Sequence, residues 1–393
     1  MNVLLDDDEE LIKTSAGEFL LAEATPEVVR AAEIDPLRYA KALWDKFAGL
    51  GWLGISLPEA YGGQGLPLSY TGLVFEELGR HIAPLPVHAT LVPALVIAKH
   101  ASESQKQALL PSVIDGSLML SWALQEQGGR WATDAVHMQG RMEGDHVVLN
   151  GTKHFVDNFG NADKCLVVFR MGSAGNSSLR AILVDTHSQG IQAEELVPTS
   201  KDREDLVRFE NVRVPKENLV GQNMAVISDL MDYAAAFYTC LMEGAARRAM
   251  EISVAYVNER EAFGQSIGAF QAIQHMAADM LNGVDGTQLL MREAIWHMSQ
   301  GLPARVEVAQ AKSFGNVKCM MVARCCQQLH GGIGFILDTD INLWYRRVAS
   351  WSMRSGTTYE HRQLIASSLL DMPGKVRLGM LQTVHESTLA CGE

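Results

Sequence analysis

The heptapeptide Gln328-Leu329-His330-Gly331-Gly332-Ile333-Gly334 spans the end of a stretch, from about Ala304 to His330, that we predict to be a long helix. The glycine pair predicts where this helix ends, because glycine is favoured just past a helix C-terminus. Gly301-Leu302-Pro303 separates it from an earlier predicted helix. Apolar residues recur there at the spacing of one buried helical face: Ile273, Met276, Met280, Val284, Met291, Ile295 and Met298. The C-terminal part is therefore predicted to be a four-helix bundle.

The middle of the chain, from about Leu118 to Asn223, has short apolar runs in place of helical periodicity. Asn150-Gly151 lies between two such runs, which predicts the turn of a β-hairpin. Three further strands are predicted, at Cys165 to Met171, Ala181 to Val184 and Leu206 to Val214. These patterns indicate a small β-domain.

The N-terminal part is again helical in pattern, up to about Ile114. Helices are predicted at Leu37 to Phe47 and Tyr70 to Leu78, with an irregular Gly/Pro-rich turn between them. We therefore predict an α+β fold that is mostly α. Its three domains are an N-terminal helical domain over 1–117, a middle β-domain over 118–222 and a C-terminal helical bundle over 223–393.

Composition narrows the class of protein. The 393 residues carry a net charge of −13, which argues against nucleic acid or an anionic membrane surface as the main partner. No apolar run approaches the roughly 20 residues of a membrane span. Met1 to Glu10 holds five acidic residues and no cationic segment, from which we expect a cytoplasmic protein. The six cysteines form no CxxC pair, so neither a metal site nor a disulfide framework is predicted.

Five local sequences, in this order, resemble signature segments of the acyl-CoA dehydrogenase family over about residues 51–362. They are Gly51 to Ile55 with Pro58 to Gly65, Asn150 to Lys153, Phe209 to Pro215, Arg260 to Gly264 with Gln271, and Gln328 to Gly334. The resemblance implies that family's helical–β–helical fold, FAD as cofactor and α,β-dehydrogenation of an acyl-CoA thioester. It also implies an electron-transfer flavoprotein as the usual electron acceptor.

The resemblance further implies that the flavin lies between two subunits. The positions that match residues given to a neighbour's flavin are all retained: Arg260, Phe263, Gln271, Gln328, Gly331 and Gly332. An arginine offers forked donors to pyrophosphate, and paired glycines let backbone N–H groups approach it closely. The alternatives left open are a plain helix C-cap at Gly331-Gly332 and a surface ion pair at Arg260.

The residues that would hold the isoalloxazine end depart from the family pattern. Gln125 to Arg130 replaces the Thr-Glu-Pro…Gly-Ser-Asp loop, so two hydroxyl groups are lost and a bulky charge is added. Phe155 matches an aromatic residue that covers the flavin, although an ordinary strand residue is an equal alternative. Asp157 replaces a hydroxyl residue beside the flavin, and Thr357 is retained among the cofactor-binding positions.

The catalytic base is also missing from the pattern. Ser355-Gly356-Thr357 stands where the family has Glu-Gly-Thr, whose glutamate takes the α-proton while the flavin takes a hydride. A serine cannot take that proton at neutral pH without a base of its own. The family's alternative base position, 26 residues before Arg260, is Ala234. Three nearby carboxylates are interpreted as solvated helix residues: Asp232, Glu243 and Glu360.

We therefore predict a base-lacking subunit that completes the flavin site of a homologous, Glu-bearing partner in an α₂β₂ heterotetramer. In the resembling family, enzymes of that arrangement oxidise bulky CoA thioesters such as steroid side chains. Three alternatives stay open. They are an active homotetramer with a relocated base, a flavin-dependent monooxygenase of the same fold, and a structural subunit without flavin.

Overall fold

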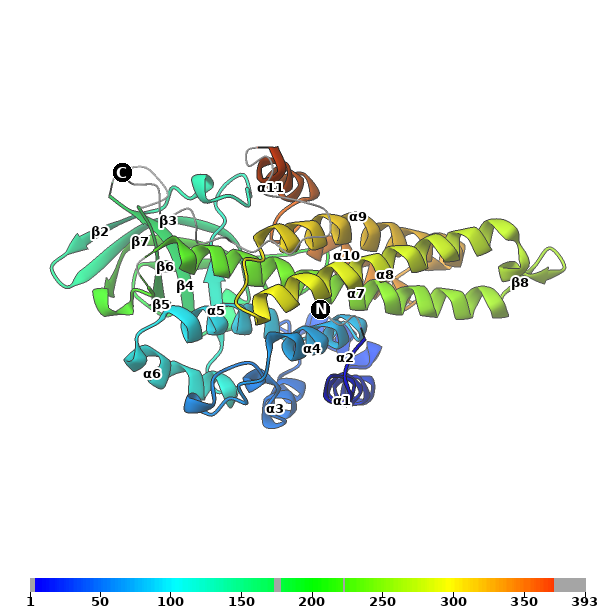
Figure 1. Cartoon of the computed structure of the whole chain (residues 1–393), viewed down its shortest axis with the longest axis horizontal. Coiled ribbons are helices and arrows are strands. Elements are labelled where there is room, and N and C mark those ends of the chain that lie inside the picture. Colours follow the sequence, from blue (N-terminus) through cyan, green and yellow to red (C-terminus); the bar gives the residue numbers. More distant parts are fainter. Residues whose placement is uncertain (1–3, 173–177, 222, 371–393) are drawn as a thin grey trace, which may run out of the picture.

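The structure is a computed structural model that describes residues 4–172, 178–221 and 223–370. Figure 1 shows an elongated molecule with a curved sheet at one end and a long helical bundle that projects from the other. The N-terminal helices pack along both parts. Among the described residues, no helix has both the length and the apolar character that a membrane crossing requires.

Six helices form the N-terminal part: α1 (Asp7–Glu23), α2 (Pro26–Ile34), α3 (Lys41–Gly49), α4 (Leu68–Arg80), α5 (Val87–His100) and α6 (Glu103–Ile114). The first and last begin with capping boxes, in which the side chains of Asp6 and Ser102 accept a hydrogen bond from a backbone N–H of the first turn. The predicted helix at Leu37 to Phe47 begins four residues later than expected, because Arg38 has a positive φ of 60°.

The sheet contains β1 (Leu120–Ala123), β2 (Gln139–Glu143), β3 (His146–Asp157), β4 (Lys164–Met171), β5 (Leu179–Asp185), β6 (Ile191–Leu196) and β7 (Glu204–Pro215). Its order is β1-β4-β2-β3-β7-β6, and β5 pairs with β4. The long antiparallel ladder between β3 and β7 carries Phe155, Asp157 and Glu204, which are described below. The sheet has its own apolar core, and β1, β4 and β5 also contribute residues to a larger core that they share with the helices.

The predicted hairpin turn at Asn150-Gly151 is wrong. β3 passes through both residues as one strand, with an irregularity against β7 between Leu149 and Gly151. Gly151 supplies a φ of 151°, and the Asn150 side chain accepts a hydrogen bond from the Asn211 N–H across the ladder. Asn150 alone opposes Glu210 and Asn211 there, so the β-bulge lies on β7. The turn that joins β2 to β3 lies earlier, at Gly144-Asp145.

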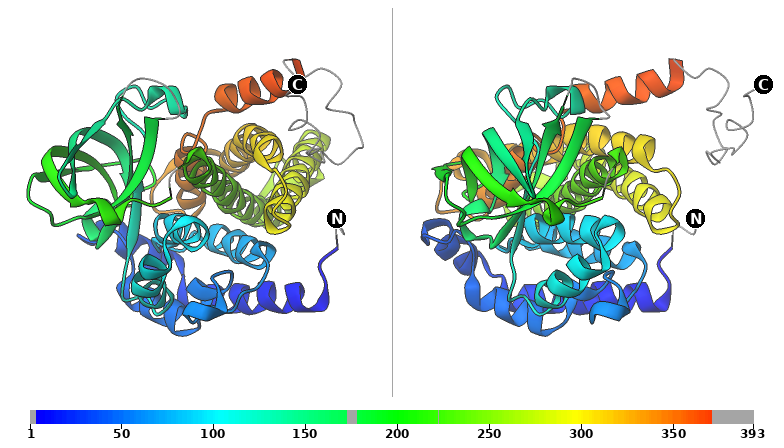
Figure 2. Two further views of the ribbon diagram at one scale, coloured as in Figure 1. Left: turned by 60° about the vertical axis from the view of Figure 1, so that its left-hand side comes forward. Right: turned by 90° about the vertical axis from the view of Figure 1, so that its left-hand side faces the viewer.

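The bundle consists of α7 (Met224–Glu259), α8 (Gln271–Ser299), α9 (Arg305–His330), α10 (Ile341–Trp351) and α11 (Thr358–Leu370). The long helix predicted from about Ala304 to His330 matches α9. Figure 2 shows the bundle beside the curved sheet, with α4 and α5 packed beneath α7. At the crossing of α4 and α7, Gly79 and Gly244 let the two backbones meet without intervening side chains.

Candidate functional site

The far end of the bundle carries part of the predicted flavin-binding set. α7 ends at Glu259, and a two-stranded turn, β8 (Glu261–Ala262) with β9 (Gln265–Ser266), leads into α8. Arg260 begins this turn, and Gln271 is the first residue of α8. The turn that contains β8 lies at the far end of the bundle (Figure 1). Within it, Phe263 has a positive φ of 55° and 93% of its surface exposed.

The rest of the set comes from the end of α9. Gln328 is exposed, and its carbonyl accepts the Gly331 N–H, which caps the helix. Gly331 has φ 61° and ψ −139°, and a Cβ at Gly331 or Gly332 would meet no atom within 4 Å. The rings of Tyr256 and His330 stack with centroids 4.4 Å apart, so the ends of α7 and α9 lie side by side.

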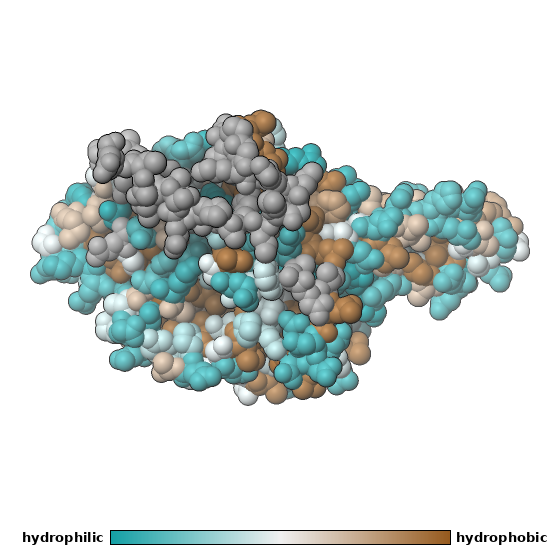
Figure 3. Space-filling view, in the orientation of Figure 1, coloured by the Kyte–Doolittle hydropathy of each residue, from teal (hydrophilic) through white to brown (hydrophobic). Residues whose placement is uncertain are grey.

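These six residues therefore gather at one exposed end, the bundle tip: Arg260, Phe263, Gln271, Gln328, Gly331 and Gly332. Exposed backbone N–H groups beside an arginine can bind pyrophosphate. Figure 3 shows hydrophobic residues between hydrophilic ones on the projecting part of the bundle. The helix C-cap at Gly331 is present, and it leaves Gly332 open to a ligand.

The bundle tip lies far from Phe155 and Ser355. Arg354, next to Ser355, donates a hydrogen bond to Tyr238 in the middle of α7. From Tyr238 to Arg260 the helix rises by about 33 Å at 1.5 Å per residue. Within one chain, the tip and the predicted isoalloxazine residues are thus two separate places. A flavin that uses both kinds of residue must lie between two chains.

Phe155 lies on β3 under the loop that follows β1. Its backbone has a positive φ of 55° and its ring is 46% exposed, so it is not an ordinary buried strand residue. The loop is held to the sheet by its own hydrogen bonds: the Gln125 carbonyl accepts the His154 N–H at 2.9 Å. The Glu126 carboxylate pairs with the buried Lys153 at 2.7 Å. Burial lowers the pKa of Lys153 to about 8.

Trp131, which directly follows this loop, connects it to the Ser355 turn. The Trp131 N–H donates to Glu360 Oε1 at 2.7 Å, and Glu360 Oε2 accepts both the N–H and the hydroxyl of Thr357 at 2.9 Å. The interpretation of Glu360 as a solvated residue is therefore wrong. Its carboxylate holds the loop and the turn together. Thr357, predicted to bind cofactor, has both donors engaged by Glu360.

The Ser355 turn is strained and filled. Ser355 has φ 52° and is 2% exposed, and Gly356 has φ 99°. A Cβ at Gly356 would lie 2.3 Å from His361 Nε2 and 2.8 Å from Trp131 Cδ1. The same His361 nitrogen is 2.9 Å from the Ser355 carbonyl, and burial lowers the pKa of His361 to about 4, so the ring is neutral.

A buried polar chain supports the turn from α9. Asn316 Nδ2 donates to the Gly356 carbonyl at 3.1 Å, and Lys312 Nζ donates to Asn316 Oδ1 at 2.7 Å. Burial lowers the pKa of Lys312 to about 7. Ser355 Oγ is buried and has no hydrogen-bond partner among the described residues. Among the described residues, the carboxylate that contacts this turn is that of Glu360, which accepts hydrogen bonds from Trp131 and Thr357.

Arg354 lies in a buried group of charges that the sequence analysis did not detect. Its guanidinium contacts Asp157 at 3.0 Å, Asp202 at 2.9 Å and Glu204 at 3.4 Å, and Tyr238 donates to the Asp157 carboxylate. We call these five residues the Arg354 cluster. Asp157, expected beside a flavin, is instead buried, and burial raises its pKa. No local signal joins residues so distant in sequence.

From the buried Glu204 carboxyl we predict that the free energy of unfolding depends on pH. Burial raises its pKa to about 7 from an ordinary 4.5, so folding favours the protonated form. The stability that this carboxyl contributes is full below pH 4.5 and is lost as the pH rises through 7. Relative to the wild type, Glu204→Gln is therefore expected to gain up to about 3 kcal/mol of unfolding free energy between pH 5 and pH 8. Denaturant unfolding at the two pH values measures this.

Asp202 provides the control of opposite sign. Contact with Arg354 and the positive charge of Arg347 keep the pKa of Asp202 below its ordinary value despite burial. Asp202→Asn is expected to lose more stability at pH 8 than at pH 3. Equal pH profiles for the two variants would contradict this assignment of charges.

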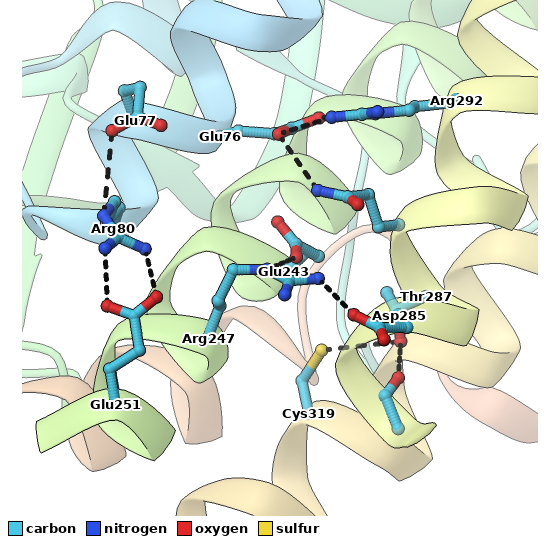
Figure 4. Close-up of polar contacts among 12 residues, drawn as sticks. Glu76, Glu77, Arg80, Glu243, Arg247, Glu251, Asp285, Thr287, Arg292 and Cys319 are labelled. Carbon is cyan, nitrogen blue, oxygen red and sulfur yellow. Dashed lines mark hydrogen bonds and ion pairs between the residues drawn. The ribbon is translucent and has the colours of Figure 1, made fainter. Parts of the chain in front are cut away.

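Glu243 is not solvated either, which corrects that interpretation, whereas Asp232 is half-buried. Glu243 is 1% exposed and pairs with Arg247 at 2.6 Å inside the bundle, where burial raises its pKa to about 7 (Figure 4). Asp232 borders a cavity of about 30 Å³ beside Trp131 and His361, and burial raises its pKa to about 7. That cavity has room for about one water and none for a thioester.

Comparisons with known proteins agree with this architecture. Residues 6–117 match the N-terminal domain of acyl-CoA dehydrogenases, and residues 223–370 match their C-terminal domain. The 3-(aryl)acrylate reductase of Clostridium sporogenes is 29% identical over 93% of this chain and 99% of the relative. The short-chain specific acyl-CoA dehydrogenase of Clostridium acetobutylicum is 28% identical over 94% of this chain and 100% of the relative.

Solved structures show the same similarity. A variant of the steroid ACAD Tcur3481-Tcur3483 is 30% identical, with a TM-score of 0.85 over 92% of this chain and 97% of the other. The ChsE4-ChsE5 complex from Mycobacterium tuberculosis has the same fold, with a TM-score of 0.89 at 23% identity over 95% of this chain and 100% of the other. Together with the helical–β–helical architecture, these matches show that the chain belongs to the acyl-CoA dehydrogenase family, whose members are FAD-dependent oxidoreductases that act on acyl-CoA thioesters.

Proposed function

We propose that this chain is the base-lacking subunit of a heteromeric acyl-CoA dehydrogenase. One contrast carries the proposal: the bundle tip is exposed, whereas the Ser355 turn is buried and filled by the chain's own side chains. The tip would bind the adenine and pyrophosphate end of an FAD whose isoalloxazine lies in the partner. When bound, that flavin accepts a hydride from the acyl group.

In this proposal the partner's glutamate removes the α-proton and this chain orients the cofactor. Arg260 would pair with pyrophosphate, Gln271 and Gln328 would offer amide groups, and Gly332 would leave backbone N–H groups accessible. Phe263 would cover an apolar part of the nucleotide. The likeness to the Tcur3481-Tcur3483 steroid ACAD supports a bulky, steroid-type acyl-CoA as the substrate class and a two-chain assembly.

Expression with and without a homologous, Glu-bearing chain tests the proposal. Alone, the protein is expected to be colourless; the co-purified complex is expected to show oxidised flavin absorbance, with one flavin per partner chain. Acyl-CoA should bleach the colour of the complex. A chain that is yellow alone and bleached by acyl-CoA would contradict the proposal and indicate an active homotetramer. Oxygen-dependent hydroxylation with added reduced flavin would indicate a monooxygenase, and a colourless complex a structural subunit.

Restoring the glutamate alone is expected to fail. Ser355→Glu would place a carboxylate in a turn with no exposed space, so we expect a lower melting temperature and no acyl-CoA oxidation by the chain alone. Ser355→Ala is the control. It is expected to change stability by less than about 1 kcal/mol, because Ser355 Oγ has no hydrogen bond to lose among the described residues. Flavin bleaching by the glutamate variant would show that the chain's own site is open.

A further inference from the structure

The residues next to the two predicted reaction positions contact each other. Asp157 lies two positions after Phe155, the predicted flavin platform, and Arg354 directly precedes Ser355, the position of the family glutamate. Arg354 Nη1 and Asp157 Oδ1 are 3.0 Å apart. An acyl group that reacts must lie between flavin and base. We propose that the Arg354 guanidinium is a permanent internal occupant that closes this chain's own reaction site, an inference that rests on the proposed function.

Carboxylates from the sheet surround this guanidinium. Asp157 is the last residue of β3, Glu204 is the first residue of β7, and Asp202 lies just before β7. Asp202 receives two hydrogen bonds, from Nη1 at 3.0 Å and Nη2 at 2.9 Å. Two parallel bonds of this kind fix the orientation of a guanidinium as well as its position. The Arg354 side chain is only 11% exposed, so water screens these contacts weakly.

The cluster also fastens the sheet to the helices. Tyr238 on α7 donates to the Asp157 carboxylate and accepts from Arg354 at 3.2 Å. Its ring lies against His88 of α5, with centroids 3.8 Å apart. His88 Nε2 is 3.1 Å from the Ala234 carbonyl, and burial lowers the pKa of His88 to about 3, so this ring is neutral beside Arg354. Arg354 thus lies where four parts of the chain come together: the sheet, α5, α7 and the Ser355 turn.

The space that remains beside the cluster is small. A cavity of about 80 Å³ is bordered by His88 and Asn158 on its polar side and by Phe75, Leu78 and Leu241 on its apolar side. Ligand pockets for molecules of acyl-thioester size measure roughly 300–1,000 Å³. His88 Nδ1 and Asn158 Nδ2 have no hydrogen-bond partner among the described residues. A few water molecules suit this cavity, and an acyl chain does not.

Removal of the guanidinium provides the test, without flavin or partner. Arg354→Ala leaves three carboxylates around an empty space, so its melting temperature is expected to fall by about 5 °C or more. About 20 mM guanidinium chloride, far below denaturing concentration, should recover part of that loss by refilling the space. Sodium chloride or methylammonium chloride at the same concentration should not, because neither offers a planar fork of donors.

Matched variants make the result specific. Arg141→Ala removes an exposed arginine of β2 and is expected to change the melting temperature little, with no response to guanidinium. Arg354→Lys keeps the charge but loses the planar fork of donors. Its melting temperature is expected to lie between those of the wild type and Arg354→Ala, and guanidinium is expected not to raise it. This variant also keeps the proposal testable if Arg354→Ala fails to fold. An alanine variant as stable as Arg141→Ala, or rescue by all three salts alike, would overturn the proposal.

The outcomes separate this inference from the proposed function. If guanidinium alone raises the melting temperature of Arg354→Ala but no coloured complex forms with the partner, Arg354 is supported as the internal occupant and the proposed flavin binding by the bundle tip is refuted. A coloured complex, with no recovery of the Arg354→Ala melting temperature by guanidinium, would support flavin binding at the bundle tip and refute the internal occupant.

Discussion

Gly244→Ala is expected to prevent stable folding of this chain. A Cβ at residue 244 would lie 1.9 Å from the Glu76 carbonyl oxygen and 2.8 Å from the Arg80 nitrogen, both of them backbone atoms of α4. The contact is reciprocal, because a Cβ at Gly79 would lie 2.1 Å from the Leu241 carbonyl oxygen. The helices could accept the methyl group only by moving apart. The cost should exceed about 3 kcal/mol, measured as unfolding free energy or as loss of soluble protein.

Separation of these helices would also disturb charges. Glu76 on α4 is buried and pairs with Lys13 at 2.6 Å and Arg292 at 3.4 Å, so it connects three helices near the crossing (Figure 4). Gly49→Ala is the matched control, since a Cβ there meets nothing within 4 Å and helical alanine is favoured over glycine. It should be neutral or stabilising by up to about 1 kcal/mol. Equal stability of the two variants would contradict the close crossing.

Arg260→Ala is expected to lower the flavin affinity of the complex with the partner by about 10- to 100-fold, the loss of a charge-assisted pair with pyrophosphate. Because Arg260 is exposed at the bundle tip, the melting temperature of the isolated chain should not change. Flavin release during dialysis of the complex, followed by absorbance, measures the effect.

Two controls make that result specific. Arg141→Ala removes a similar exposed charge from the sheet and should leave the flavin affinity unchanged. Arg260→Lys keeps the charge without the fork and should give an intermediate loss. If the complex that contains Arg260→Ala binds flavin as tightly as the wild-type complex, the cofactor lies elsewhere, and the proposal that the bundle tip binds the partner's flavin is contradicted.

Local patterns predicted much of the fold because they depend on neighbouring residues. Helical spacing and the Gly331-Gly332 pair predicted α9 and its end. The Asn150-Gly151 pair misled, because a glycine with an unusual φ occurs opposite a β-bulge as well as in a hairpin turn. Only the pairing of β3 with β7, more than fifty residues away in sequence, distinguishes the two.

The candidate site was predictable only in part, for a related reason. Motifs located the residues of the bundle tip, whose position at the helix ends follows from local structure. The Arg354 cluster joins Asp157 to Arg354 across almost two hundred residues, and no periodicity signals such a pair. The burial of Glu243 and the hydrogen bonds of Glu360 were missed because a helical carboxylate is most often exposed. Arg247 lies one helical turn from Glu243, but the burial of that pair comes from packing, and Trp131 reaches Glu360 only through the fold.

The exposed Phe263 at the end of a long helical hairpin has a consequence for the cell. In the proposed heteromer, a chain made in excess of its partner would present this aromatic residue and a two-stranded turn to solvent, together with the exposed Phe335 and Leu337 beyond α9. Such surfaces attract chaperones, proteases and other unassembled chains. Balanced synthesis of the two subunits, or assembly during translation, would therefore be needed to keep the protein from degradation.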